Sequence, residues 1–353
     1  MFRPFLTTFC LICSLVLGGC AAPLGSGVGS GSGAGSNAGP DMDLPPIADL
    51  TGYILVDPAN GQAVSVETVA AALASADVVF IGESHRHPGN HIAQMAIFRA
   101  LHQHSGNMAL SLEQFDRDVQ PVMDQYLAGE IGEAALRRKG RAWDNYPVSY
   151  RPLVEYAKTH GMPVIAAEAP NMVIRCVGRQ GPGFLDTIPA DKRGWAAAEL
   201  HLNDGPYKDR FVAFADGNAS HGEAPENGQV SEAVLRSFAA QVTRDDTMAE
   251  SIVKQITKRP GTQVVHLNGS FHSAGFLGTA ERVKWRRPDL EIAVVHPIEV
   301  EDAMAPSIPA DKLGEGNFLL LIAPAPKTYV TKQEEIDAVM EQMKFRESVD
   351  CGL

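Results

Sequence analysis

The stretch DVVFIGESHRHPGNHIAQMAIFRALHQH, residues 77–104, determines the predicted fold class. It opens with a short apolar run, Asp77–Gly82, which is typical of a buried β-strand. From His91 to His104 the apolar side chains recur at helical spacing, which predicts an α-helix. A buried strand that leads into a helix is the repeating unit of a parallel sheet covered by helices.

The same alternation of strand and helix patterns continues along the chain. Strands are predicted at Met108–Leu112, Met162–Ala167, Gln263–Leu267, Leu290–Val295 and Phe318–Ala323, and helices at Ser149–His160 and Ser231–Lys258. The polar stretch Arg117–Gly140 also has helical character, and we expect it to be a small insertion. The chain is therefore predicted to be an α/β protein with a largely parallel sheet, helices on both faces and a small helical insertion.

Acidic and imidazole side chains follow several of the predicted strands. Glu83 and His85 follow the first strand, Glu113 follows the second, and His272 comes shortly after the strand at Gln263–Leu267. Because the carboxyl ends of parallel strands lie at the same sheet edge, where ligands bind in open α/β sheets, we expect these four side chains to converge.

Two further residues are candidates for the same edge. His91 opens the first predicted helix, and one helical turn could bring it back toward the strand ends. Glu168 follows the strand at Met162–Ala167 and is the weaker candidate. A single histidine or glutamate near a strand end is usually a hydrogen-bonded structural residue or a helix cap. Four at matching strand ends favour a functional cluster.

Carboxylates and imidazoles together suit two kinds of chemistry. They are ligands for a borderline metal such as Zn²⁺ or Mn²⁺, and the candidate ligand set is Glu83, His85, His91, Glu113 and His272. They also suit general acid–base catalysis without any metal. The residues themselves leave both possibilities open.

The first 19 residues have the three parts of a signal peptide: a short start with Arg3, an apolar run from Phe5 to Leu17, and small residues before Cys20. The segment Leu17-Gly18-Gly19-Cys20 resembles a lipobox. The alternatives are an ordinary signal peptide or a membrane anchor, but the run is shorter than the roughly 20 residues that span a bilayer. We expect lipidation of Cys20, and Ala21 after it points to the outer membrane.

Composition divides the rest of the chain. Residues 24–39 are almost entirely Gly, Ser and Ala, so 20–44 is predicted to be the lipidated cysteine and a flexible tether. Residues 45–353 are predicted to form the α/β domain, and a hydrophobic content of 45% supports a substantial core. The net charge of -12 argues against nucleic acid as a partner.

Two cysteines, Cys176 and Cys351, belong to the predicted domain. Cys10 and Cys13 would leave with the signal peptide, and Cys20 would carry lipid. An exported protein reaches a compartment that permits disulfides, but the sequence leaves open whether these two cysteines pair.

The motifs at the predicted sheet edge resemble those of a known family. Gly82-Glu83-Ser84-His85 with His91, and Gly269-Ser270-Phe271-His272, form a pair of Gly-x-x-His motifs with Glu113 between them. The combination resembles the ChaN-like haem-binding lipoprotein family, which shares a superfamily with the erythromycin esterases and the Tiki proteases. The resemblance covers most of residues 75–295, including the segment from Trp143 to Tyr150.

The resemblance implies an α/β domain that binds haem for iron acquisition, in dimers that hold two stacked haems with tyrosine as the iron ligand. Tyr146 and Tyr150 are the candidate ligands nearest the family-like segment, although aromatic packing is the alternative interpretation of both. Glu168 departs from the asparagine expected in many relatives. The chain has no Cys-x-x-Cys-His motif, which excludes covalent c-type haem.

Two functions from different classes follow. The first is a membrane-anchored haem-binding lipoprotein in haem and iron acquisition, with haem, the lipid bilayer and a second copy of the chain as partners. The second is a metal-dependent hydrolase, esterase or protease-like, that uses Glu83, His85, Glu113 and His272. The predicted anchor and the resemblance favour haem, and the Glu/His cluster favours catalysis. A structural lipoprotein with a degenerate site is a third possibility.

Overall fold

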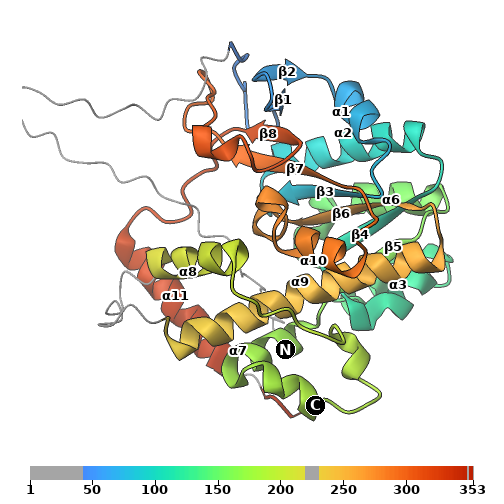
Figure 1. Ribbon diagram of the computed structural model, residues 1–353, viewed down its shortest axis with the longest axis vertical. Coiled ribbons are helices and arrows are strands. Elements are labelled where there is room, and N and C mark those ends of the chain that lie inside the picture. The colour runs from blue at the N-terminus through green and yellow to red at the C-terminus, as the bar shows by residue number, and fades with distance from the viewer. Residues whose placement is uncertain (1–42, 219–229, 348–349, 353) are drawn as a thin grey trace, which may run out of the picture.

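The computed structural model describes residues 43–218, 230–347 and 350–352. At its centre is an eight-stranded sheet with the strand order β2-β1-β8-β7-β3-β6-β4-β5 (Figure 1). The strands are β1 (Tyr53–Asp57), β2 (Gln62–Val64), β3 (Val78–Glu83), β4 (Met108–Asp116), β5 (Val164–Glu168), β6 (Gln263–Gly269), β7 (Ile292–Glu299) and β8 (Phe318–Ile322). The six strands from β8 to β5 are parallel, which confirms the predicted fold class.

Two short strands were not predicted. β1 pairs antiparallel with β8, and β2 pairs antiparallel with β1 at the edge of the sheet. β2 has only three residues, of which two are exposed, so it carries no hydrophobic alternation that a sequence pattern could reveal.

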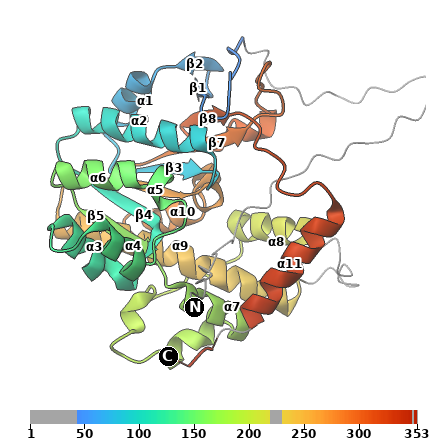
Figure 2. The same ribbon diagram turned by 180° about the vertical axis from the view of Figure 1, so that it is seen from behind.

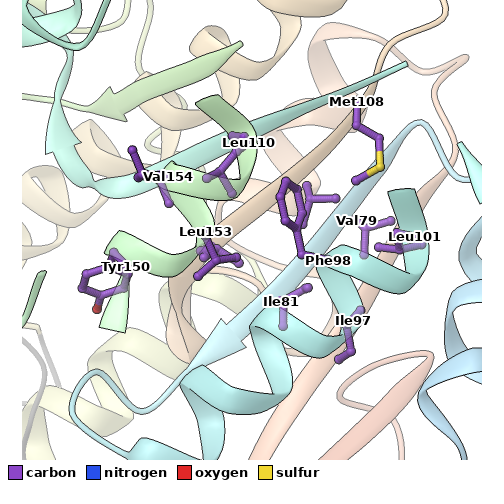
Figure 3. Packing of buried hydrophobic residues seen from close by; sticks show 14 of the residues in the cluster. Val79, Ile81, Ile97, Phe98, Leu101, Met108, Leu110, Tyr150, Leu153 and Val154 are labelled. Atoms are coloured by element: carbon purple, nitrogen blue, oxygen red, sulfur yellow. The ribbon is translucent and has the colours of Figure 1, made fainter. Parts of the chain in front are cut away.

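Helices cover both faces of the sheet. One face is covered by α1 (Val66–Leu73), α2 (Pro88–His104), α3 (Gln120–Leu127), α4 (Glu133–Lys139), α5 (Tyr146–Ser149) and α6 (Arg151–Thr159). The other is covered by α9 (Glu232–Lys258) and α10 (Thr279–Arg286). Alternate residues of a strand point to opposite faces. Val79 and Ile81 therefore pack under α2 (Figure 3), while Val78 and Phe80 pack under α9 and α10.

The predicted helical insertion is present between β4 and α5 and consists of α3 and α4. The helix predicted over Ser149–His160 is present as α6, and the short helix α5 precedes it. Pro152 sits in the first turn of α6, where a residue without a backbone N–H begins a helix well. Short 3₁₀ turns occupy Arg117–Val119, Pro182–Thr187, Arg193–Trp195, Ser270–His272, Ala274–Phe276 and Ala310–Lys312.

Three further helices lie around the end of α9 that is farther from the sheet (Figures 1 and 2). They are α7 (Asn171–Gln180), α8 (Pro206–Asn218) and α11 (Lys332–Glu347). A disulfide joins Cys176 of α7 to Cys351, which answers the question that the sequence left open. It links parts of the chain that are 175 residues apart.

The predicted signal peptide, the lipobox and Cys20 lie outside the described residues, as does almost all of the tether. Within the described ranges, every helix is too short or too polar to cross a lipid bilayer.

Candidate functional site

The sheet order places four strand ends next to one another. β3, β6, β4 and β5 are consecutive neighbours and run parallel, so their carboxyl ends form one continuous edge. The residues that these ends bring together are Glu83, His85, Glu113, Glu168 and His272, all buried. β4 continues past Glu113 to Asp116, with an irregular register against β5 after Leu112.

Glu83 is the best-connected carboxylate of this Glu/His cluster. Its Oε1 accepts hydrogen bonds from His85 Nδ1 at 2.8 Å and from the Tyr150 hydroxyl at 2.6 Å. Gln114 Nε2 donates to the same oxygen at 3.2 Å, and Gln94 Nε2 donates to Oε2 at 2.8 Å. Burial opposes ionisation, but the hydrogen bond from His85, the charges of His91 and His85, and the Tyr150 hydroxyl outweigh it and lower the pKa of Glu83 to about 2. The ionised carboxylate therefore holds His85 in a fixed orientation.

His91 supports this arrangement from the first turn of α2. Its Nδ1 lies 3.8 Å from Glu83 Oε2 and 2.9 Å from Gln94 Oε1. Its Nε2 donates to the main-chain oxygen of His85 at 2.9 Å. Both ring nitrogens thus face hydrogen-bond acceptors, so His91 orients its neighbours and offers no free nitrogen to a metal ion.

A second carboxylate–imidazole pair faces the first. His272 Nδ1 donates to Asp245 Oδ1 at 2.7 Å, and His272 Nε2 lies 3.7 Å from Glu113 Oε1. Asp245 also accepts hydrogen bonds from the hydroxyls of Tyr207 at 2.5 Å and Thr279 at 2.8 Å. Burial disfavours the imidazolium, but Asp245 and Glu113 outweigh it and raise the pKa of His272 to about 9. His272 is therefore a cation at neutral pH.

Gly269 is where the two pairs meet. Its backbone N–H donates to Glu113 Oε2 at 2.5 Å, and a Cβ atom built on it would lie only 2.8 Å from His85 Nε2. Any larger residue would push His85 away from Glu113. The close approach of this backbone to the His85 imidazole therefore explains why the second Gly-x-x-His motif begins with glycine.

Glu168 reaches the same edge from β5 and forms an ion pair with Arg244 of α9, with Nη1 and Oε2 2.7 Å apart. Burial raises the pKa of Glu168 to about 7, although the guanidinium opposes this shift. The weaker candidate of the sequence prediction is thus a buried, paired carboxylate at the margin of the cluster.

Tyr146 and Tyr150, the expected haem ligands, both have an exposed fraction of 0%. Tyr150 donates its hydroxyl proton to Glu83, and burial together with that carboxylate raises its pKa well above the usual range. Burial also raises the pKa of Tyr146. Since ferric iron requires an accessible oxygen and favours the phenolate, neither tyrosine fits an axial ligand in this packing. The aromatic-packing interpretation describes their positions here, since both belong to the core cluster, in which Figure 3 shows Tyr150.

The proposed metal ligands converge, but they do not form a coordination shell. Among the described residues, no group of three or more His, Cys, Asp or Glu side chains is arranged to hold a metal ion. The physical reason is that several of these side chains already face one another. His91 has a hydrogen-bond acceptor beside each ring nitrogen. His272 Nε2 lies 3.7 Å from Glu113 Oε1, and its Nδ1 is bonded to Asp245. The oriented imidazoles of His85 and His272, together with the Glu113 carboxylate, can instead hold and exchange protons.

Several residues of the cluster were missed by the sequence prediction. Asp245 and Arg244 lie in the middle of α9. In the sequence of an amphipathic helix, such a charged pair predicts a solvent-exposed face. Both are almost completely buried, at 0% and 5% exposure. Gln94 and Gln114 follow the predicted residues closely but carry no charge that would mark them. Only the tertiary contact with Glu83, Glu168 or His272 identifies these side chains.

The family described as "Haem-binding uptake, Tiki superfamily, ChaN" matches residues 69–283, which span the sheet edge and both motifs. Among curated proteins, Reticulata-related 5 of Arabidopsis thaliana, a chloroplastic protein, is 25% identical over 217 residues. That match covers 57% of this chain but only 28% of the relative.

Two solved structures are similar in fold. The structure of cofacial haem binding to ChaN of Campylobacter jejuni has a TM-score of 0.55 and 18% identity, and the match covers 76% of this chain and 96% of that one. Erythromycin esterase EreC in its open conformation has a TM-score of 0.39 and 13% identity, with 81% and 87% of the two chains covered. At these identities the first match supports the fold alone, and the second carries no further argument.

Proposed function

Because this chain belongs to the ChaN family of haem-binding uptake proteins in the Tiki superfamily, we propose that it is a membrane-anchored haem-binding lipoprotein that takes part in haem and iron acquisition. The observation that carries the proposal is the family match over residues 69–283, which contains the complete Glu/His cluster. The hydrolase alternative is less well supported, because the cluster lacks the ligand arrangement that a metal-dependent hydrolase requires.

His85 fits haem better than the two tyrosines do, because its side chain keeps 9% exposure and theirs keep none. His85 Nδ1 is fixed by Glu83, while no described residue hydrogen-bonds to its Nε2, and a carboxylate-oriented imidazole is a common iron-ligand arrangement. Trp143 stands edge-on to the His85 ring at 5.0 Å between centroids, and Val148 is 78% exposed nearby on α5. Haem would supply ferric iron to the His85 imidazole and a flat apolar ring to the surface around Trp143 and Val148.

Titration of the purified protein with haemin tests the proposal. We expect saturable binding with a shifted Soret band, and His85→Asn should weaken it at least tenfold. Tyr150→Phe and Tyr146→Phe should leave the spectrum unchanged. Absence of saturable binding by the wild type would refute the function. Loss of the band in a tyrosine variant, with His85→Asn unaffected, would show that a tyrosine leaves the core to ligate iron.

The anchor and the assembly are part of the same proposal. The lipobox-like Leu17-Gly18-Gly19-Cys20 and the Gly/Ser-rich stretch after it support lipidation and an outer-membrane location. We expect Cys20→Ala to lose incorporation of a palmitate analogue and to leave the membrane fraction. Equal labelling of variant and wild type contradicts the anchor. Light scattering with and without haemin tests the expected homodimer.

A further inference from the structure

A groove of about 560 Å³ lies along the β5 edge of the sheet, a volume typical of sites for small molecules. Residues 162–166 form its floor, and α3 and α9, which flank β5, form its walls (Figures 1 and 2). Gln120 of α3 already occupies backbone groups of Val164 and Ala166. A ligand in this β5 groove would therefore meet mainly side chains, and not a free strand edge.

The lining of the β5 groove is strongly basic. Its charged residues are Arg117, Lys158, Lys254, Lys258, Arg259 and Asp124. Five of these six are cations, whereas the whole chain has a net charge of -12. A cleft lined by one sign of charge focuses the electric field inside it and concentrates ions of the opposite sign. A basic groove on an acidic protein therefore favours an anionic ligand.

Two of the cations meet toward the carboxyl end of β5. Arg117 Nη1 and Lys254 Nζ lie 2.8 and 2.6 Å from the same oxygen of Glu250, Oε1. Burial opposes ionisation of Glu250, but a backbone N–H and these two cations outweigh it and lower the pKa of Glu250 to about 2. With two cations on one ionised carboxylate, this end of the groove keeps one net positive charge.

The cations toward the amino end of β5 have no such partner. Lys158 lies at the end of α6, with its Nζ 3.8 Å from the centroid of the Tyr126 ring. Lys258 and Arg259 are exposed at the end of α9. None of these three cations forms an ion pair with a described carboxylate. A phosphate group carries nearly two negative charges and three acceptor oxygens, so it balances this end better than a carboxylate does.

A buried donor on the α9 wall favours an anionic ligand independently of the net charge. Gln255 lines the groove next to Lys254, and its Nε2 is shielded from solvent with no hydrogen-bond partner among the described residues. Buried polar groups are nearly always hydrogen-bonded in folded proteins. A rotation of the carboxamide toward the groove would let this nitrogen donate to an anionic oxygen there.

We propose that the β5 groove binds a small polyanion with a terminal phosphate group, of the class of linear polyphosphates and small organic phosphates. The terminal phosphate lies among the three unpaired cations, and a further anionic group reaches Arg117 and Lys254. Lys254 and Lys258 are one helical turn apart, roughly 6 Å along α9, so a ligand of a few phosphates can contact both. The Gln255 amide donates between them. This site is separate from the Glu/His cluster and does not depend on haem binding.

Calorimetric titration of the full-length protein with tripolyphosphate tests the site, at about 0.15 M salt and without divalent cations, so that weak surface attraction is screened. We expect one bound equivalent. The double variant Lys258→Gln/Arg259→Gln should lose at least tenfold in affinity, and Gln255→Leu, which changes no charge, should lose severalfold. The matched control is Arg138→Gln/Lys139→Gln, which removes an adjacent exposed pair of cations from α4, outside the groove, and should bind like the wild type.

Several outcomes would overturn the site. The wild type could show no saturable binding, or the control could lose as much affinity as the double variant. If Gln255→Leu binds like the wild type, the attraction belongs to the surface charge and not to a built site. Citrate bound as tightly as tripolyphosphate would refute the phosphate class.

Two further titrations separate the sources of the anion. Phosphatidylglycerol vesicles that bind through Lys258 and Arg259, without binding of tripolyphosphate, would assign the groove to a membrane surface and overturn the proposal. Loss of haemin binding in the double variant, with tripolyphosphate binding unchanged, would assign these cations to haem carboxylates and overturn it as well. Equal thermal unfolding midpoints show that the variants are folded.

Discussion

At the scale of single residues, the environment of each hydroxyl decides what it does. Tyr146 and Tyr150 come from the same short segment and are equally buried, yet their hydroxyls differ. Tyr150 donates to the Glu83 carboxylate at 2.6 Å, whereas the Tyr146 hydroxyl has no hydrogen-bond partner among the described residues. Comparing the two tyrosines therefore separates the contribution of a buried aromatic ring to stability from that of a hydroxyl with a hydrogen-bond partner.

Tyr150→Phe should destabilise the protein by about 1.5–3 kcal/mol, because it removes a hydrogen bond to a buried carboxylate. Tyr146→Phe should be neutral or stabilising, since it removes an unsatisfied hydroxyl. Urea unfolding of the two variants measures the difference. Equal losses in both would mean that the Tyr150–Glu83 bond contributes nothing.

The raised pKa of His272 predicts a specific pH dependence. A histidine whose folded pKa is about 9 instead of the usual 6.5 adds stability that is fully present below pH 6.5 and is lost as the pH rises through 9. The shift corresponds to about 3 kcal/mol. Unfolding free energies of wild type and His272→Asn should therefore converge from pH 6.5 to 9. A constant difference across this range would contradict the raised pKa.

At the scale of secondary-structure elements, one side chain protects the β5 edge of the sheet. Among the described strands, β5 pairs only with β4, and its free backbone groups could recruit another strand. Gln120 of α3 occupies two of them: its Nε2 donates to the Val164 oxygen at 2.9 Å, and its Oε1 accepts from the Ala166 N–H at 2.7 Å. The helical insertion thus covers the edge.

Gln120→Ala should cost about 1–2 kcal/mol of stability, because two backbone hydrogen bonds are lost, and should increase aggregation on heating. Thermal unfolding combined with light scattering measures both effects. Gln125→Ala, at an exposed position of the same helix, is the control and should change neither. If both variants aggregate alike, the edge is protected by something other than Gln120.

At the scale of the whole molecule, the Cys176–Cys351 disulfide ties the C-terminal segment to α7. This bond closes a very long loop, so it restricts the unfolded chain strongly. The linked segment packs on the helices around α9 and not on the sheet that carries the Glu/His cluster (Figure 1).

Replacing Cys351 with Ser should lower stability by about 2–4 kcal/mol and make residues 324–352 sensitive to limited proteolysis. Dithiothreitol should produce the same cleavage pattern in the wild type and no further change in the variant. Haemin binding should persist in both. If the wild type gives the same cleavage pattern with and without dithiothreitol, the disulfide does not protect this segment from proteolysis.

The sequence by itself determined the strands of the parallel sheet, the helices α2, α6 and α9, the helical insertion, and which strand ends carry Glu83, Glu113 and His272. This was possible because hydrophobic periodicity is local, and because all parallel strands present their carboxyl ends at one edge. The resemblance to the family rested on the same residues. Its Gly-x-x-His motifs lie at strand ends, and the hydrophobic pattern of the sequence locates those ends.

Only the tertiary structure decided the partners of these residues. Sheet order puts β6 between β3 and β4, which brings Gly269 against His85 and Glu113. Asp245 meets His272, and Cys176 meets Cys351, across long stretches of chain. Tyr150 turns into the core, where its hydroxyl meets Glu83. Such contacts depend on how distant elements pack, and no local pattern of charge or hydrophobicity encodes that packing.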